Sequence, residues 1–294
     1  MGTADGGNQG AAVTGVSVSD AGAAPSAAAS ARLALLCWAA EQVGPVATPN
    51  GAGEVAASVA PPAWVAERYR LCGWITGEDS AFGLSAGRVF YGWVLADGPA
   101  YVLALRGTES AIEWLVDFDF PPRSGYRLGG EVESGFYGLY ETLDFQPVGG
   151  AAGSLLAGVA RLVGSDPLTV TGHSLGAALA TYAAVELAEA GAHVAGRFIA
   201  SPRPGDTGFA DAFAARVADA VDYHYAPDIV GDVPIGFGYS PLQCVETIPA
   251  NPRVPDNPAS NHHAVHYAWL LDPASLEVLP EGEREGVVEG LNPT

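Results

Sequence analysis

The sequence contains no lysine: its 13 basic residues are all arginine, against 33 aspartates and glutamates, and the formal net charge is −20. Binding to nucleic acid requires a basic surface that contacts phosphates, so this composition argues against a nucleic-acid partner. Tight docking on an anionic lipid surface is disfavoured for the same reason. The acidic excess fits a highly soluble protein, and it would also repel a carboxylate product.

Cysteines and long apolar runs are also scarce. Cys37, Cys72 and Cys244 are an odd number of cysteines with wide spacing, which fits neither a disulfide framework nor a metal site. We expect buried free thiols, with one disulfide bridge as the alternative in an exported protein. No segment reaches the roughly 18 consecutive apolar residues of a membrane-spanning helix.

The first 29 residues differ from the rest of the chain, because they contain no aromatic residue, no leucine and no isoleucine. Such a stretch buries too little apolar surface to offset its ordering entropy. We therefore expect a disordered tail over residues 1–29 and a folded domain over residues 30–294. The tail lacks the pattern of a signal peptide, since the first basic residue is Arg32. Without a recognisable signal peptide, we expect a protein that is cytoplasmic or exported by an unrecognised route.

Beyond the tail, segments with helical periodicity alternate with short apolar runs. Alternation of this kind predicts an α/β fold, with a largely parallel sheet that is covered by helices on both faces. The predicted helices span residues 32–42 (with Ser30 as N-cap), 110–118, 151–163, 175–190 and 209–220, and the predicted strands span residues 71–76, 88–95, 100–105, 168–171, 193–200 and 221–225.

Residues 172–176, Gly-His-Ser-Leu-Gly, match the pattern G-x-S-x-G. The pattern alone is weak, but here it directly follows one predicted strand and directly precedes a predicted helix. That strand–turn–helix is the nucleophile elbow of α/β hydrolases, a turn so sharp that flanking Cβ atoms would clash. Ser174 is therefore the candidate nucleophile, and the N–H of Leu175 is placed to stabilise an oxyanion.

A serine nucleophile needs a histidine as its base and a carboxylate that orients the histidine, in the chain order Ser, Asp, His. Asp228 follows the predicted strand 221–225, where such an acid belongs, and Asp222 and Asp232 are its competitors. Late in the chain stands a cluster of three candidate bases: His262, His263 and His266.

Several segments, taken together and in order, resemble the class 3 lipase family of α/β hydrolases. They are YVLALRGTESAIEWLVD (101–117), VESGF (132–136), VTGHSLGAAL (170–179), SPRPGDTGF (201–209) and Asp228-Ile229-Val230 with Pro234 nearby. Two positions depart from the family, since Glu133 replaces the histidine of its H-x-G-F motif and Leu105 replaces a phenylalanine. The first change affects packing and not catalysis, because that histidine is structural in the family.

The resemblance, which spans about residues 71–272, implies roles for individual residues. Ser174 would be the nucleophile and Asp228 the acid, while Thr108 and Leu175 would supply the backbone N–H groups of the oxyanion hole. Bacterial and plant members tend to place the base five positions before a tyrosine in the last helix. That spacing selects His262 ahead of Tyr267 and leaves the other two histidines of the cluster as alternatives.

The family's lid overlies residues 110–118, where Ile112, Leu115 and Phe118 fall at three-residue intervals and predict an amphipathic helix. A mobile lid and a surface helix that stays packed on the core fit this pattern equally well. The resemblance implies a lipase that cleaves acylglycerols or related lipid esters through an acyl-enzyme, without metal or cofactor. The alternatives are a phospholipase, a small-ester or polyester esterase, and a non-catalytic binding protein, against which the intact Ser, Asp, His order argues.

Overall fold

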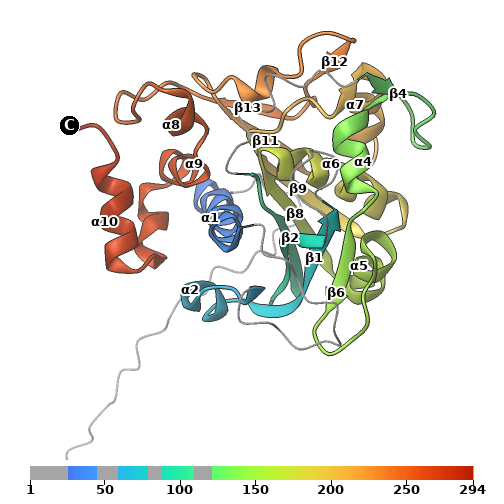
Figure 1. Ribbon diagram of the computed structural model, residues 1–294, viewed down its shortest axis with the longest axis horizontal. Helices are drawn as coiled ribbons and strands as arrows, with labels where there is room; N and C mark the ends of the chain where they lie inside the picture. The colour runs from blue at the N-terminus through green and yellow to red at the C-terminus, as the bar shows by residue number, and fades with distance from the viewer. Residues whose placement is uncertain (1–25, 45–58, 79–87, 109–120, 294) are drawn as a thin grey trace, which may run out of the picture.

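The computed structural model describes residues 26–44, 59–78, 88–108 and 121–293 (Figure 1). Its central sheet has nine strands in the order β13-β11-β9-β8-β3-β2-β1-β6-β7. In chain order they are β1 (Arg70–Glu78), β2 (Arg88–Asp97), β3 (Ala100–Leu105), β6 (Asp144–Pro147), β7 (Gly153–Ser154), β8 (Pro167–His173), β9 (His193–Ile199), β11 (Ala220–Tyr225) and β13 (Val245–Ile248).

Most strands of this sheet run in one direction. The five neighbouring strands β3, β8, β9, β11 and β13 pair in parallel. On the other half of the sheet, β2 and β6 run antiparallel to their neighbours. The expectation of a mostly parallel sheet is therefore confirmed. A small second sheet joins β4 (Pro122–Arg123), β5 (Val132–Glu133), β10 (Gly205–Asp206) and β12 (Tyr239–Ser240).

Helices cover the central sheet on two sides (Figure 1). One side carries α1 (Ala27–Val43), α2 (Ala63–Ala66), α9 (Ala264–Leu271) and α10 (Glu281–Glu289), and the other carries α4 (Ser134–Tyr140), α5 (Leu155–Val163), α6 (Leu175–Glu189) and α7 (Thr207–Ala214). The short helix α8 (Pro258–His262) directly precedes α9, and two 3₁₀ helices are η3 (Val230–Asp232) and η4 (Pro273–Val278). None of the helices in the described ranges has the length and apolar character required to cross a bilayer.

Helix α6 lies at the centre of the fold. Every residue from Leu175 to Leu187 is buried, and five of these residues are alanine. A helix that is apolar all round belongs inside a protein. The small alanine side chains let α6 lie close to β8 and β9, the strands that it contacts most. The strand before Ser174 and the helix after it are therefore both core elements.

The predicted elements agree with the structure in type and differ at some ends. Helix α1 begins at Ala27 with Ser26 as its N-cap, so the predicted cap at Ser30 is wrong and residues 26–29 do not belong to a tail. Ser30 is buried inside the helix, where its hydroxyl lies 2.9 Å from the hydroxyl of Tyr223 in β11. The alanines at 27–29 carry little apolar surface, but alanine has the highest helix propensity.

Two further helix boundaries are corrected. Helix α5 begins at Leu155, because residues 153–154 pair with β6 as the edge strand β7. Helix α7 begins at Thr207, where the Asp206 side chain accepts from the N–H of Phe209, and it ends at Ala214, six residues before the predicted end. The predicted helix 110–118 and residues 1–25 of the predicted tail lie outside the described residues.

All three cysteines are free thiols, as expected. Cys37 and Cys72 are buried, and Cys244 is half-buried. The hydroxyl of Thr171 lies 3.7 Å from the Cys37 sulfur, so this thiol joins α1 to β8.

Glu133, the residue that departs from the family pattern, begins helix α4. Its Oε2 accepts a 2.6 Å hydrogen bond from the N–H of Phe136, which caps the helix in the usual manner of an acidic N-cap. Only 1% of the residue is exposed, and its Oε1 has no hydrogen-bond partner among the described residues. Burial raises the pKa of this carboxyl from 4.5 to about 7, against the lowering effect of its hydrogen bonds from backbone N–H groups.

This raised pKa predicts a loss of stability with rising pH. Between pH 4.5 and about 7 the carboxyl ionises in the unfolded chain but stays protonated in the folded protein, so the folded state binds more protons. The stability that Glu133 contributes below pH 4.5 is therefore lost as pH rises through 7. We expect Glu133→Gln, which keeps the capping oxygen, to gain in melting temperature relative to wild type from pH 5 to pH 8. The exposed Glu67→Gln serves as control, and a difference that is constant with pH would contradict the assignment.

Candidate active site

The candidate nucleophile stands at a sharp turn between two core elements. Strand β8 ends at His173, helix α6 begins at Leu175, and Ser174 between them has a φ of 57°. This left-handed conformation is strained for a residue with a side chain, and such strain is typical of functional positions. The Ser174 N–H donates to the carbonyl of Ile199 at the end of β9, which holds the turn in place.

Two glycines allow this turn to form. A Cβ on Gly172 would lie 2.1 Å from the carbonyl oxygen of Gly176, so only glycine permits the chain to fold back this tightly. A Cβ on Gly176 would lie 2.3 Å from the carbonyl oxygen of Arg106. The first turn of α6 therefore packs directly against the backbone that follows β3, two residues before Thr108. The elbow predicted from the sequence is the elbow that the structure contains.

Asp228 lies three residues beyond β11 and is bound by the side chain of His262. The His262 Nδ1 is 2.8 Å from the Asp228 Oδ2, the Tyr267 hydroxyl donates to the same oxygen at 2.8 Å, and the Val230 N–H donates to Oδ1 at 3.0 Å. Burial alone would raise the pKa of Asp228. The hydrogen bond and charge of His262, with the bonds from Val230 and Tyr267, outweigh burial and hold the pKa below its usual value.

The two competing acids are bound elsewhere. Asp222 is buried in β11, where its Oδ2 lies 2.9 Å from the Nε2 of His224. Asp232 pairs with Arg203 at 3.1 Å, and its side chain is 78% exposed. Of the three candidates, Asp228 is therefore the acid that contacts a histidine of the late cluster.

His262 is the last residue of α8 and is buried. Its Nδ1 faces Asp228, so the catalytic proton would be exchanged at its other nitrogen, Nε2. Neither this Nε2 nor the Ser174 Oγ has a hydrogen-bond partner within the described ranges, although both atoms are buried. Burial lowers the pKa of His262, while Asp228 raises it in part, so the imidazole is neutral and can accept a proton at neutral pH.

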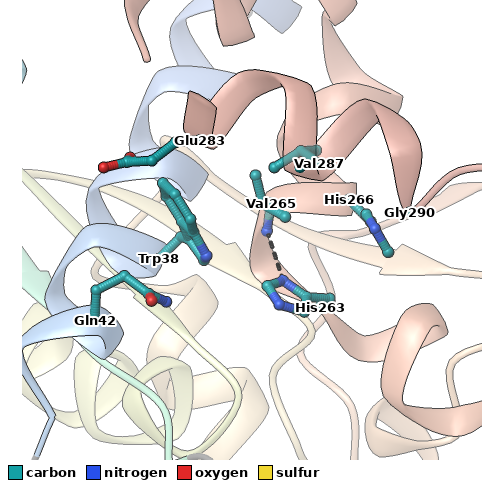
Figure 2. A pocket seen from close by; sticks show the side chains of 9 residues that line it. Trp38, Gln42, His263, Val265, His266, Glu283, Val287 and Gly290 are labelled. Carbon is teal, nitrogen blue, oxygen red and sulfur yellow. Dashed lines mark hydrogen bonds between the residues drawn. The ribbon is translucent and has the colours of Figure 1, made fainter. Parts of the chain in front are cut away.

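The other two histidines of the cluster face a different space. His263 and His266 line a cavity of about 310 Å³ between α1, α9 and α10, together with Trp38 and Val287 (Figure 2). Burial and the neighbouring His266 lower the pKa of His263 to about 4, so this imidazole is also neutral. Neither Ser174 nor Asp228 lines this cavity. Both histidines are therefore turned away from the acid.

The two oxyanion-hole candidates lie just after β3 and at the start of α6. Thr108 is half-buried three residues after β3, and Leu175 is the first residue of α6, whose early N–H groups have no partner within the helix. Arg106 fixes the segment that leads to Thr108. Its guanidinium donates at 2.7 Å to the carbonyl of Phe90 and at 2.7 Å to the carbonyl of Gly107.

Three side chains to which the sequence assigns no role also support the proposed triad. Tyr267 donates to Asp228 and accepts from the N–H of Tyr225 at 2.8 Å, so one hydroxyl links the acid to β11. His173 and Glu41 form a second imidazole–carboxylate pair beside the first. The family's histidine–tyrosine spacing includes Tyr267 only as the residue from which the base is counted, and His173 stands within the elbow, but nothing local identifies Glu41. Among the described residues, no cluster of three or more His, Cys, Asp or Glu side chains could hold a metal ion.

Known lipases and phospholipases resemble this chain. The family model described as Lipase (class 3) matches residues 102–237, which confirms the resemblance seen in the sequence. Phospholipase A1-II 3 of Oryza sativa subsp. japonica is 34% identical over 189 residues, which cover 53% of this chain and 43% of the relative. Phospholipase A1-II 6 of the same subspecies is 36% identical over 135 residues, or 37% of this chain and 33% of the relative. The chain thus spans less than half the length of these curated relatives.

Solved structures share the fold. M37 lipase superposes with a TM-score of 0.62 at 14% identity, covering 88% of this chain and 98% of that one. The Lip2 lipase of Yarrowia lipolytica superposes with a TM-score of 0.56 at 19% identity, covering 79% of this chain and 81% of that one. These similarities show that the chain has the α/β-hydrolase fold.

The contact between Asp228 and one histidine generates a prediction. His262→Ala should lower the turnover of a soluble p-nitrophenyl ester by about 10³-fold or more, because it removes the group that would deprotonate Ser174. His263→Ala and His266→Ala, which line the separate cavity, should retain most activity. Turnover of the three variants at matched folded fraction tests this. An inactive His263→Ala beside an active His262→Ala would refute the assignment of the base.

Proposed function

We propose that this chain is a serine carboxylic-ester hydrolase that cleaves lipid esters, with Ser174, Asp228 and His262 as its catalytic triad. The observation that carries the proposal is the buried 2.8 Å contact between His262 Nδ1 and Asp228 Oδ2 beside the strained elbow. The rings of His262 and of His173, the residue before Ser174, have centroids 4.6 Å apart, so the base lies next to the elbow. The similarity to class 3 lipases supports the same reaction.

The reaction would proceed in two halves. His262 Nε2 takes the proton of the Ser174 hydroxyl as the oxygen attacks the ester carbonyl. The N–H groups of Thr108 and Leu175 stabilise the oxyanion, and losing one such donor typically costs about 10²–10³ in turnover. As the intermediate collapses, His262 returns its proton to the leaving alcohol and an acyl-enzyme remains. Water, deprotonated by the same nitrogen, then releases the acid and restores Ser174.

Asp228 supports both halves of this cycle. Its carboxylate accepts a hydrogen bond from the Nδ1–H of His262, which fixes the tautomer that leaves Nε2 free to accept a proton. When His262 becomes an imidazolium, the negative charge of Asp228 stabilises it inside a buried site. Tyr267 and the Val230 N–H hold the carboxylate in this orientation.

A loop beside the acid supports a lipid as the substrate. Ile229, Ile235 and Phe237 are 47%, 74% and 50% exposed, and all three lie within ten residues after Asp228. Phe237 has a φ of 48°, between Gly236 and Gly238, which also have positive φ values. A left-handed phenylalanine costs on the order of 1 kcal/mol, and this half-exposed ring does not recover that cost by full burial. Contact with an apolar surface would recover it.

The charge of the chain indicates which lipid surface fits this loop. A net charge of −20 without a single lysine would repel anionic membranes. A neutral or zwitterionic surface, such as a triacylglycerol droplet or a phosphatidylcholine bilayer, carries no such penalty. We therefore place the substrate at a neutral lipid–water interface.

Within this proposal the substrate is either an acylglycerol, as for a lipase, or a phospholipid, as for a phospholipase, which the names of the curated relatives favour. The two candidates use the same triad and differ in the headgroup of the substrate. Parallel assays on triacylglycerol emulsions and on phosphatidylcholine vesicles separate them.

Ser174→Ala tests the proposed chemistry. This change removes the nucleophile without orphaning a hydrogen bond between described residues, so the fold should persist while ester hydrolysis falls by several orders of magnitude. A stopped-flow assay with a p-nitrophenyl ester should show a burst of p-nitrophenol for wild type and none for the variant. Circular dichroism controls for the fold. A folded variant with undiminished turnover would exclude the mechanism.

The exposed loop generates a prediction about interfaces. The double variant Ile235→Ser/Phe237→Ser should lose roughly tenfold or more in activity on a triacylglycerol emulsion, because burying each side chain in lipid contributes about 1.5–3 kcal/mol. Activity on a soluble ester should not change. Val148→Ser removes an apolar side chain of similar exposure (46%) just beyond β6 and is the matched control. Equal losses on both substrates would show that the loop does not mediate lipid contact.

A further inference from the structure

A second imidazole–carboxylate pair lies directly beside the proposed triad. His173, the residue before Ser174, places its Nδ1 2.5 Å from the Oε1 of Glu41 in the last turn of α1. Both side chains are largely shielded, with exposed fractions of 5% and 14%. The two residues are 132 positions apart in the sequence. The proposed mechanism does not use this pair.

The hydrogen bonds of His173 require a positively charged ring. Its Nε2 lies 2.7 Å from the backbone carbonyl oxygen of His262, which can only accept a hydrogen bond. Its Nδ1 faces a carboxylate, which when ionised can also only accept. Both ring nitrogens must then donate, and an imidazole that donates from both nitrogens is an imidazolium.

The electrostatic surroundings agree with these charges. Burial opposes the charged form of each partner. The charge and hydrogen bond of Glu41 nevertheless raise the pKa of His173 above its usual value, and those of His173 lower the pKa of Glu41. The carboxyl end of helix α1 carries a partial negative charge, which stabilises the nearby imidazolium further.

Glu41 also reaches the oxyanion segment. The Gly107 N–H donates to the same Oε1 at 3.2 Å, and Gly107 directly precedes Thr108. One carboxylate on α1 therefore holds the segment after β3 directly, and through His173 it holds the main chain of His262. These contacts join three parts of the site that lie far apart in the sequence.

We propose that Glu41 and His173 are positioning residues, which together fix the main chain of the base, the elbow and the oxyanion segment relative to one another. This inference rests on the proposed function of Ser174, Asp228 and His262. The bond from the His173 imidazolium to the His262 carbonyl is charge-assisted, and such bonds are shorter and stronger than neutral ones. It holds the backbone of the base, while Asp228 holds its ring.

Removing the charge of Glu41 should disturb this arrangement. In Glu41→Gln the amide oxygen can still accept from Gly107 and His173, but without the carboxylate His173 gives up a proton. A neutral His173 donates from one nitrogen only. It must therefore release the carbonyl of His262 or the side chain at position 41, or its Nδ1 must accept from the amide NH2 group, which then no longer presents its oxygen to the Gly107 N–H. Small displacements of catalytic groups cost up to about 10²-fold, so we expect kcat on a soluble ester to fall roughly 10- to 100-fold with KM unchanged.

The matched control is a buried imidazole–carboxylate pair elsewhere in the sheet. Asp222 and His224 pair at 2.9 Å within β11, and neither hydrogen bonds to Ser174, His262 or Gly107. Asp222→Asn therefore removes a buried charge of the same kind and should lower the melting temperature while leaving kcat unchanged. An equal loss of kcat in both variants at matched folded fraction would show that Glu41 acts through general stability and overturn the proposal.

A measurement that needs no activity tests the charge itself. We expect the ¹H–¹⁵N spectrum of the histidine rings of the whole wild-type chain at pH 8 to contain a ring with protons on both nitrogens that belongs to His173. His224, whose pKa is raised against burial by the charge of Asp222, is assigned separately with Asp222→Asn. The His173 signal should be missing in His173→Gln and should show a neutral ring in Glu41→Gln. A neutral His173 in the wild-type protein would overturn the proposal. If the wild-type chain hydrolyses no ester, the proposed function fails, while the spectrum still reports on the ion pair.

Discussion

The geometry of the site depends on the close backbone contact between the first turn of α6 and the segment after β3. A Cβ at Gly176 would meet the Arg106 carbonyl at 2.3 Å, and one at Gly172 would meet the Gly176 carbonyl at 2.1 Å. Because these backbones touch, the end of β3 and the start of α6 stand side by side. The candidate oxyanion residues Leu175 and Thr108 belong to these two segments, and no side chain lies between the backbones at Gly176 and Arg106 that could vary their spacing.

The buried charged groups of the site depend on their hydrogen-bond partners. Asp228, Glu41 and His173 are buried or nearly so, and the cost of burying a charge is several kcal/mol unless partners compensate it. Each of these groups is compensated by short hydrogen bonds, from His262 and Tyr267 for Asp228 and between Glu41 and His173. Losing one partner would leave a buried charge without compensation, so these residues form a unit and not a set of independent contacts.

The sequence predicts the parts of the site that depend on local pattern. The elbow is visible because its glycines, its strand and its helix are contiguous, and Asp228 is visible because it follows a strand. His262 needed the resemblance, since three histidines stand close together and only the turn between α8 and α9 separates their directions. Glu41 could not be predicted, because it resembles any charged residue near a helix end, and its partner is 132 positions away.

The family match covers only part of the proposed site. Residues 102–237 contain Thr108, Ser174 and Asp228, whereas His262 and Glu41 lie outside that range. The matched segment therefore contains the proposed nucleophile, acid and oxyanion residues, and the flanking segments contain the proposed base and Glu41. Helices α1 and α9, which pack on each other, bring these two flanks together on one side of the sheet. Since both Glu41 and the carbonyl of His262 contact His173, the elbow is the point at which the flanks and the matched segment meet.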